Sequence, residues 1–568
     1  MAQASMKVAP KPLAPIPFNV PRPVRTTLEN GLRVVIIEDS RLPLVNCRLA
    51  FLSGDADDPS DSIGLTSALA AMLTEGTENY TSRALAEKIE RLGASISASS
   101  SDDFTLISAS TLALYNSEIL GLLAEIVFKP TFPEQELDLY RRNTIEHLKF
   151  QRSQPSYLAG EQTARIIYGG HPYSRVSPTA ADVEKITAGE LADLHRSRFV
   201  PNNAVIIIVG DVEEDQLMRD IRSHFGEWAA GEAVRRPVPA LKPLDDRKLT
   251  IVDRPGSAQS NIVLANLAIR RDDPDYFAVL VMNQVLGAGA SSRVFMNLRE
   301  EKGYTYGAYT RLDTRKEAGD LEATAEVRTA VTGDSLKEFF FELNRIRDED
   351  VGLAELEDAK NFLTGVFPIR AETQEGLTGL IVTQELYGLP EDYLNTYREN
   401  VRAITADDVR RVAEKYITPD QMSIVIVGDA GEILEQAAAY SDNVEIFDAE
   451  GQKKDAGQLG AGEDAADFSG VWTLDLDFQG QNVPITLTVE QSGNSLTGTL
   501  ETMLGNGEIT GGSVRGDSFS ATANTEIQGQ NVEFIISGAL DNGTIAGTIS
   551  AAIIPDSLSF TGTRKTVI

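Results

Sequence analysis

Residues 63–77 of the chain read IGLTSALAAMLTEGT. Four apolar side chains in this stretch recur at the spacing of one helix face: Leu65, Leu69, Met72 and Leu73. That spacing predicts a short amphipathic helix whose apolar face is buried. We expect Asp61 or Ser62 to cap the start of this helix, and Gly76 to end it.

The frame of this helix resembles the zinc-binding helix of the insulinase, pitrilysin and mitochondrial processing peptidase family of metallopeptidases (family M16). The residues that carry the resemblance are Gly64, Leu65, Met72, Leu73, Gly76 and Thr77. In that family two histidines on one helix face bind zinc, and a glutamate activates the metal-bound water. In this chain the three corresponding positions are Ser67 and Ala71, in place of the two histidines, and Ala70, in place of the glutamate. A hydroxyl and two methyl groups neither bind zinc nor accept a proton, so the resemblance implies a member without its own catalytic centre.

The four histidines of the chain also form no zinc-binding pair. The chain has four, His147, His171, His195 and His224, and no two have the spacing of neighbours on one helix face. The family's third zinc ligand is a glutamate on a later helix, and the resemblance places Glu146 near that position. The alternative, a solvated or locally paired Glu146 beside His147, is favoured because the other ligands are missing. His171 and His195 are interpreted as structural, and we expect no metal ligand in this chain.

A second motif, residues 283–306, reads NQVLGAGASSRVFMNLREEKGYTY. Gly287 and Gly289 favour a tight turn before a helix and are assigned to a substrate loop. They do not indicate a nucleotide-binding site, because no βαβ unit surrounds them. The whole segment resembles a family block in which an arginine contacts substrate and a tyrosine hydroxyl stabilises the oxyanion. The resemblance implies these roles for Arg299 and Tyr306, whose side chains are suitable hydrogen-bond donors. The alternative is an Arg299 paired with a neighbouring glutamate, Glu300 or Glu301, and a Tyr306 that is an ordinary strand residue.

The chain also repeats itself. Residues 204–211, AVIIIVGD, are echoed by residues 422–429, MSIVIVGD, 218 positions later. Two earlier apolar strands are matched in the same way: residues 32–37 by 248–252, and residues 44–52 by 261–268. Repetition at this length indicates a duplicated domain. Since strands and helices mix in each copy, the predicted fold is α+β, with two duplicated domains and mainly antiparallel sheets.

Composition divides the chain into five parts. A proline-rich stretch covers residues 1–24, interpreted as a disordered leader rather than an arm on a neighbouring subunit. The duplicated domains cover 25–235 and 240–448, and the small, polar and charged residues 449–467 read as a flexible linker. Residues 468–568 alternate short apolar strands with Gly and Asn turns, which predicts a small β-barrel resembling lipocalins.

Overall composition excludes several classes of protein. The formal net charge of −32 argues against nucleic-acid binding, which needs a basic face. No apolar run reaches about 18 residues, so no transmembrane helix is predicted. The single cysteine, Cys47, allows no intrachain disulfide. The sequence contains no signal-peptide core. The first residues, MAQAS, resemble an initiator methionine joined to the remnant of a signal-peptide cleavage site. We expect a periplasmic location, with the cytoplasm as the alternative.

Two functions from different classes follow from the resemblance. The first is a non-catalytic subunit of a heteromeric zinc metallopeptidase, supplying Arg299 and Tyr306 to a homologous zinc-binding subunit that cleaves unfolded peptides. Zinc would then belong to the partner, with no cofactor in this chain. The second is a scaffold or binding protein whose β tail binds a ligand or an envelope component. The presence of both Arg299 and Tyr306 favours the first function. A third possibility, a hydrolase with Ser67 as nucleophile, is disfavoured because no His or Lys base lies near Ser67 in the sequence.

Overall fold

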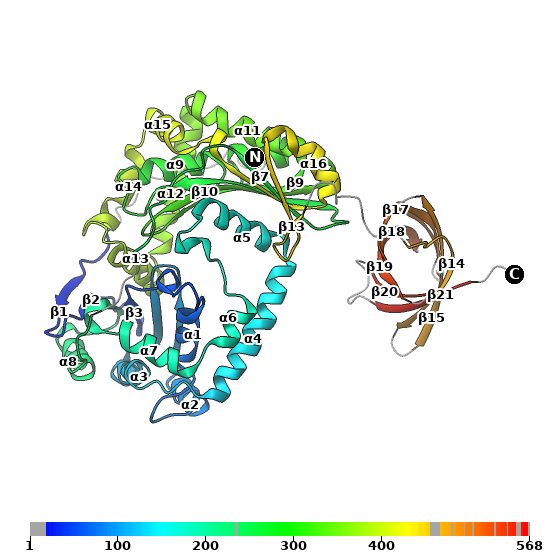
Figure 1. The fold of residues 1–568 in the computed structure, drawn as a ribbon. Coiled ribbons are helices and arrows are strands. Elements are labelled where there is room, and N and C mark those ends of the chain that lie inside the picture. The colour runs from blue at the N-terminus through cyan, green and yellow to red at the C-terminus, as the bar shows by residue number, and fades with distance from the viewer. Residues whose placement is uncertain are drawn as a thin grey trace, which may run out of the picture. The chain divides into compact units, whose positions relative to one another are not determined.

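The computed structural model describes residues 19–232, 237–454, 466–478, 481–492, 495–502, 505–527, 530–541, 543–551 and 558–565. Most of the leader predicted over 1–24, and most of the linker predicted over 449–467, lie outside these residues. Along the chain, two halves built from a sheet and helices come first and a β-barrel follows (Figure 1). This architecture confirms the predicted fold class.

The first half is built on a six-stranded sheet. In spatial order its strands are β1 (Val24–Thr27), β2 (Arg33–Glu38), β6 (Ala204–Gly210), β3 (Leu44–Phe51), β5 (Thr105–Leu112) and β4 (Ser95–Ser100). Strands β2 and β6 run parallel, whereas β3 pairs antiparallel with both β5 and β6. Every residue of β6 is buried, as expected for a continuous apolar run at the centre of a sheet.

The helices of the first half are α1 (Leu65–Met72), α2 (Ser82–Arg91), α3 (Asn116–Phe128), α4 (Glu134–Ser153), α5 (Pro155–Tyr168), α6 (Ala180–Lys185), α7 (Ala188–Arg198) and α8 (Glu214–Phe225). The apolar faces of α1, α2, α3, α4, α7 and α8 share one core with the sheet, in which Leu69 and Met72 of α1 are completely buried. The apolar face predicted for α1 is therefore confirmed. The helix is shorter than expected, because it ends at Met72 and not at Gly76.

The second half repeats the first. Its strands, in spatial order, are β13 (Lys453–Lys454), β12 (Asn443–Phe447), β7 (Lys248–Asp253), β11 (Ser423–Gly428), β8 (Gln259–Ala268), β10 (Gly319–Arg328) and β9 (Thr305–Thr314). The order β7-β11-β8-β10-β9 reproduces the order β2-β6-β3-β5-β4 of the first sheet. The duplication predicted from the two echoed strands is thus present in the strand order of both sheets. Strand β9 forms one edge of its sheet, as β4 does in the first half.

The second half carries α9 (Tyr276–Leu286), α10 (Arg293–Phe295), the π-helix η6 (Met296–Glu301), α11 (Thr332–Asp348), α12 (Leu353–Arg370), α13 (Gln374–Leu386), α14 (Tyr393–Ala403), α15 (Ala406–Tyr416) and α16 (Ala430–Ala437). Helix α13 crosses over and packs on β3 and β6 of the first half (Figure 1). The Gln374 amide at its start donates hydrogen bonds to the carbonyls of Asp39, at 2.6 Å, and Leu42, at 3.1 Å.

The C-terminal part is a closed antiparallel barrel. Its strands are β14 (Gly470–Phe478), β15 (Gln481–Ser492), β16 (Ser495–Thr502), β17 (Gly505–Arg515), β18 (Ser518–Ile527), β19 (Gln530–Asp541), β20 (Thr544–Ala551) and β21 (Leu558–Arg564). Strand β14 pairs with both β15 and β21, which closes the barrel. Alternate residues point inward and form an apolar core that includes Trp472, Phe519 and Phe560. The predicted β-barrel is therefore confirmed.

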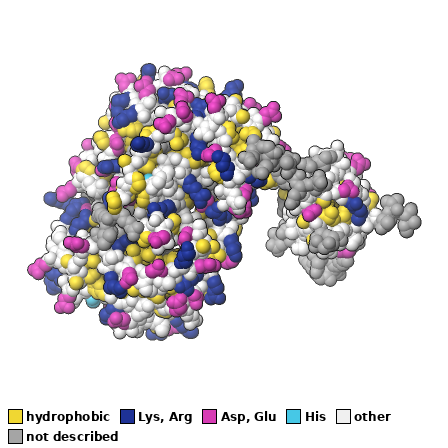
Figure 2. All heavy atoms as spheres, viewed as in Figure 1, with side chains coloured by type: hydrophobic (Ala, Val, Ile, Leu, Met, Phe, Trp, Pro, Cys, Tyr) yellow, Lys and Arg dark blue, Asp and Glu magenta, His cyan; other side chains and the backbone are white. Residues whose placement is uncertain are grey.

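The surface of the two halves carries both signs of charge. On the face drawn in Figure 2, Lys and Arg side chains are interspersed with Asp and Glu. On that face the acidic side chains are therefore not gathered into one patch. Among the described residues, no helix combines the length and the apolar character needed to cross a bilayer.

Candidate functional site

Helix α1, which carries the degenerate zinc-motif positions, is held at its start by a buried carboxylate. Gly64 precedes the helix with φ +85°, and the Asp58 carboxylate accepts the Gly64 N–H at 3.0 Å and the Thr66 N–H at 3.2 Å. Asp58 therefore satisfies two of the backbone amides at the helix start. The prediction of a cap at Asp61 or Ser62 is wrong, because the chain turns back and brings an earlier residue over the helix end.

A buried arginine from α7 completes this anchor. The Arg198 guanidinium donates to the Thr66 hydroxyl at 2.6 Å and lies 3.5 Å from the Asp58 carboxylate. Burial raises the pKa of Asp58, and the hydrogen bond from Thr66 and the charge of Arg198 oppose that rise. Removing one partner of such a buried pair leaves an uncompensated charge, so the pair fixes α1 to α7.

Ser67, at the first degenerate position of the zinc motif, belongs to a network of hydroxyl and carboxylate groups. Ser67 Oγ donates to Asp55 Oδ2 at 3.0 Å and lies 2.8 Å from Ser100 Oγ, which itself donates to Asp55 Oδ1 at 2.8 Å. Burial raises the pKa of Asp55 to about 6. Sequence reasoning missed Asp55 and Ser100, since only the folding of a loop and strand β4 against α1 brings them to Ser67.

These residues do not fit a zinc ion. Ala70 is buried and Ala71 is half-buried, and their methyl groups offer no donor atom. The described part of the chain contains no group of three His, Cys, Asp or Glu side chains placed to hold a metal. Among the residues that the structure describes, the hydrogen-bond partners of Ser67 are a carboxylate and a hydroxyl, and neither is the His or Lys base that activates a serine nucleophile. Helix α1 is therefore a structural element in this chain.

The residue considered as a remnant ligand, Glu146, lies on the surface of α4. Its side chain is 71% exposed and pairs with Lys149 Nζ at 2.7 Å, which is the locally paired arrangement favoured from the sequence. His171 is buried and its Nδ1 accepts the Tyr173 N–H at 3.2 Å. The His195 Nε2 lies 2.8 Å from the Val127 carbonyl, and burial lowers the pKa of both histidines. Both contribute to packing in the first half.

Arg299 and Tyr306, the pair implied by the second motif, are both exposed. Arg299 lies on η6, where it pairs with Glu300 and stands 5.0 Å from the centre of the Phe295 ring. Tyr306 is the second residue of the edge strand β9, and 92% of its surface is accessible. Within the described residues its hydroxyl has no hydrogen-bond partner. Arg299 therefore shows the surface pairing considered from the sequence, and Tyr306 is a strand residue, as in the same alternative, with a side chain that is almost fully exposed.

The two glycines of the predicted substrate loop differ in their surroundings. Gly287 is buried at the end of α9, and a Cβ there would lie 2.5 Å from the Thr310 backbone nitrogen of β9. Gly289 is half-buried, and a Cβ there would meet only the end of the Gln284 side chain, at 2.9 Å. Gly287 is thus needed for close packing of the helix on the strand. A role of either glycine in substrate binding stays a prediction.

The two halves meet at a charged cluster that the sequence did not predict. Arg315, between β9 and β10, contacts Asp102 at 2.8 Å, Asp313 at 3.1 Å and Asp320 at 3.2 Å. The Tyr168 hydroxyl donates to Asp320 at 2.6 Å, and burial raises the pKa of Asp320 to about 6. Asp102 and Tyr168 come from the first half, so one arginine joins carboxylates of both halves.

Comparison with known proteins places both halves in one family. The insulinase (peptidase family M16) model matches residues 33–177, and the peptidase M16 inactive domain model matches residues 185–363. A crystal structure of a peptidase M16 inactive domain from Pseudomonas fluorescens superposes with a TM-score of 0.68 and 27% identity, covering 72% of this chain and 98% of that one. Neither model extends to the barrel.

Two relatives carry different descriptions. The uncharacterized zinc protease YmxG of Bacillus subtilis (strain 168) is 22% identical over 414 residues, covering 72% of this chain and 99% of that protein. The non-peptidase homolog YmxG of Helicobacter pylori (strain ATCC 700392 / 26695) is 23% identical over 405 residues, covering 70% and 91%. The match to the inactive-domain model and the residues of α1 support a catalytically inactive M16-like protein. Since one M16 model matches each half and both halves share the fold, this chain belongs to the insulinase-like peptidase family M16.

Proposed function

We propose that this chain is the non-catalytic subunit of a heteromeric zinc metallopeptidase. It supplies Arg299, Tyr306 and half of the substrate chamber to a homologous subunit that carries the zinc site. The observation that supports this proposal is the 92% exposure of Tyr306 at the start of an edge strand. A tyrosine this exposed buries little apolar area in its own chain, so its presence is better explained by a contact outside the chain.

The chemistry of the pair fits a peptide substrate. Cleavage of a peptide bond places negative charge on the carbonyl oxygen, and preorganised hydrogen-bond donors stabilise that charge. The Tyr306 hydroxyl and the Arg299 guanidinium are such donors, and they lie seven residues apart in one motif. Arg299 reaches a substrate by leaving Glu300, and exchanging one exposed ion pair costs little, on the order of 1 kcal/mol or less.

The state of α1 supports the division of roles between two chains. Ser67 and Ala71 stand at its two zinc-ligand positions and Ala70 at the position of the catalytic glutamate, and Asp58 and Arg198 anchor the helix within the fold. The chain therefore keeps the shape of a peptidase half without the groups that start the reaction. Cleavage requires a partner that provides them.

The first step of the test is a pulldown of the chain from extract of its native cell. We expect a homologous chain with an intact zinc motif to co-purify, and only the mixture to cleave unfolded peptides. In that mixture Arg299→Ala and Tyr306→Phe should each lower kcat by about 10²- to 10³-fold, the effect of removing one oxyanion donor. Assembly, measured by size-exclusion chromatography, should be unchanged.

Two matched controls lie on the same strand. Tyr309 is 45% exposed, and Arg311 pairs with Glu322 at 3.0 Å, so Tyr309→Phe and Arg311→Ala remove the same chemical groups a few residues away. Cleavage should be nearly unchanged in both. If Arg299→Ala and Tyr306→Phe complexes cleave as fast as these controls, the pair plays no part in the reaction.

A scaffold role is the second candidate, and the barrel is the observation that favours it. An eight-stranded antiparallel barrel is wide enough to be filled by side chains or to hold one small ligand. It lies beyond residue 363, where the M16 matches end. If the chain is recovered alone or with envelope components, and no eluate cleaves peptides, this second role is the correct one.

A further inference from the structure

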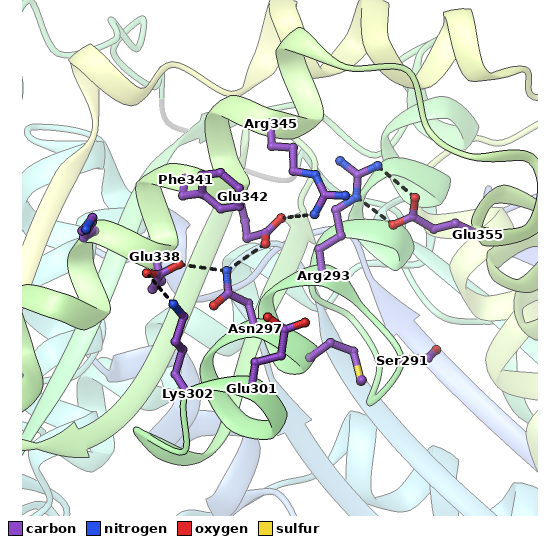
Figure 3. Close-up of a pocket in the computed structure, with 12 residues that line it drawn as sticks. Ser291, Arg293, Asn297, Glu301, Lys302, Glu338, Phe341, Glu342, Arg345 and Glu355 are labelled. Atoms are coloured by element: carbon purple, nitrogen blue, oxygen red, sulfur yellow. Dashed lines mark hydrogen bonds and ion pairs between the residues drawn. The ribbon is translucent and has the colours of Figure 1, made fainter.

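The charges at the junction between the two halves are not matched one to one. A contrasting site is the cavity between η6 and helices α11 and α12, where carboxylates lie beside separate cations (Figure 3). The pairs there are Lys302 with Glu338, Arg345 with Glu342, and Arg293 with Glu355. At the junction the Arg315 guanidinium contacts Asp102, Asp313 and Asp320, so one positive charge faces three negative charges when all four groups are ionised.

Asp320 is the carboxylate of this cluster that is least able to stay charged. Its side chain is 1% exposed, whereas those of Asp102 and Asp313 are 31% and 33% exposed and contact water. Tyr168, at 2.6 Å, and Arg315, at 3.2 Å, both donate to Asp320 Oδ2. Within the described residues, the buried Oδ1 has no hydrogen-bond partner. Because a buried, incompletely paired carboxylate is costly, a proton is held more readily on Asp320 than on the other two.

The surrounding titratable groups act in the same direction. Glu322, on the same strand as Asp320, pairs with Arg311 of β9 at 3.0 Å. The other titratable groups around the cluster are Asp103, Lys316, His171, Tyr173 and Tyr387. Burial, followed by the charge of Glu322, raises the pKa of Asp320 to about 6, and the Tyr168 hydrogen bond and the Arg315 charge oppose that rise. Burial also raises the pKa of Asp102 and of Asp103. The cluster therefore holds a proton at a pH where an exposed carboxyl is ionised.

The segments that carry these carboxylates also make the contacts between the halves. The Lys316 N–H, in the turn between β9 and β10, donates to Asp103 Oδ2 at 3.0 Å. The next N–H of that turn, from Glu317, donates to the Tyr173 hydroxyl at 3.1 Å. Asp103 and Tyr173 belong to the first half, so both bonds break when the two segments separate. Separation also admits water to Asp320 and removes the cost of its charge.

We propose that this junction is a proton-controlled latch: Asp320 carries a proton while the halves are in contact, and its ionisation releases the contact. When the junction opens, Asp320 is hydrated and returns to its ordinary pKa of 3.8. The closed junction binds the proton more tightly, so the latch is strongest below about pH 4 and weakens as the pH rises to about 6. This difference in pKa corresponds to a change of about 10²-fold in the ratio of closed to open junction. The latch lies within one chain, so it does not rest on the proposed subunit role.

The test is amide hydrogen exchange of the full chain at pH values from 4 to 8, corrected for the intrinsic pH dependence of exchange. The reporters are the Lys316 and Glu317 amides, whose hydrogen bonds cross the junction. Where reclosing is faster than exchange, their protection measures the ratio of closed to open junction. We expect that protection to fall by about 10²-fold between pH 4 and pH 7. Peptides covering residues 326–331, at the other end of β10, should keep their protection.

Two variants identify the titrating group. Asp320→Asn keeps an acceptor for Tyr168 but cannot ionise, so the protection of the reporters should fall by less than about tenfold over the same range. Tyr168→Phe removes a hydrogen bond that favours the ionised form, so the midpoint of the change should move to a higher pH. Asp193→Asn is the matched control, because Asp193 is 73% exposed and pairs with Arg196 on the surface of α7. It should keep the full pH dependence of the unmodified chain.

Several results overturn the latch. One is a reporter protection in the unmodified chain that is the same at pH 4 and pH 7. Another is an equal loss of protection in residues 326–331, which means that the whole half loosens and the junction has no switch of its own. A folded Asp320→Asn chain with an unchanged pH dependence, or a Tyr168→Phe chain whose midpoint does not rise, assigns the titration to another group and overturns the proposal as well.

Discussion

Gly287 gives the sharpest test of how the second motif is built. Replacing it with alanine adds one methyl group at a buried position where α9 ends against β9. The new Cβ would lie 2.5 Å from the Thr310 nitrogen, 2.5 Å from Thr310 Oγ1 and 2.6 Å from Thr310 Cγ2. The Thr310 N–H also donates to the Gly287 carbonyl at 2.9 Å, so the strand has to move and this hydrogen bond is strained.

The expected cost of Gly287→Ala is about 1–3 kcal/mol, the usual range for an extra carbon in a packed interior. Because the contact is with backbone, the loss should appear first in β9, the strand that carries Tyr306. Amide hydrogen exchange of peptides covering residues 305–314 measures it directly. A cost of this size accelerates exchange by about 5- to 150-fold.

Gly289→Ala is the control within the same loop. Its Cβ would meet only Gln284 Nε2, the end of a flexible side chain, so exchange in β9 should change little. Equal acceleration in the two variants would refute the packing role of Gly287. Unchanged exchange in Gly287→Ala would refute the steric argument altogether and return Gly287 to the predicted substrate loop.

Two further predictions concern stability. Asp55 has a pKa of about 6 against an ordinary value of 3.8, so the folded chain holds this proton more tightly and loses stability as pH rises from about 4 to 6. Asp55→Asn removes that loss. In urea denaturation its free energy of unfolding should exceed that of the unmodified chain by about 2–3 kcal/mol at pH 8 and by little at pH 4. A difference that does not depend on pH would contradict the role of the Asp55 charge. Arg315→Gln leaves Asp102, Asp313 and Asp320 without their cation and should destabilise the chain by about 3–5 kcal/mol in thermal unfolding. The control is Arg311→Gln, which should cost less than about 1 kcal/mol because the Arg311 side chain is 63% exposed. Equal losses of stability in the two variants would show that the Arg315 cluster does not stabilise the contact between the halves.

Local patterns predicted much of the fold. The 3.6-residue spacing of Leu65, Leu69 and Met72 identified α1, and the echoed strands ending at Gly210 and Gly428 identified the duplicated halves. Such patterns follow from which side chains face a core, and that information is local in the sequence. Helix ends were less accurate, because Asp58, which holds the start of α1, acts across a turn that no local pattern specifies.

The candidate sites divide in the same way. The roles of Arg299 and Tyr306 are predictions from a contiguous motif, and the motif on α1 showed that Ser67, Ala70 and Ala71 replace the two zinc ligands and the catalytic glutamate. Asp55 and Ser100, which surround Ser67, have no sequence signal, since a loop and an edge strand supply them. The second motif also contains Arg293 and Asn297, but their hydrogen-bond partners, Glu355 and Glu342, come from α12 and α11.

The sequence by itself determined that the chain is a duplicated M16-like fold with a β-barrel, and that its zinc helix lacks metal ligands. These properties depend on residue type and spacing alone. Only the tertiary structure decided that Tyr306 is exposed, that Arg315 joins carboxylates of both halves, and that Asp55 and Ser100 surround Ser67. The physical reason is that burial and hydrogen-bond satisfaction depend on which distant segments pack together, and no single stretch of sequence specifies that packing.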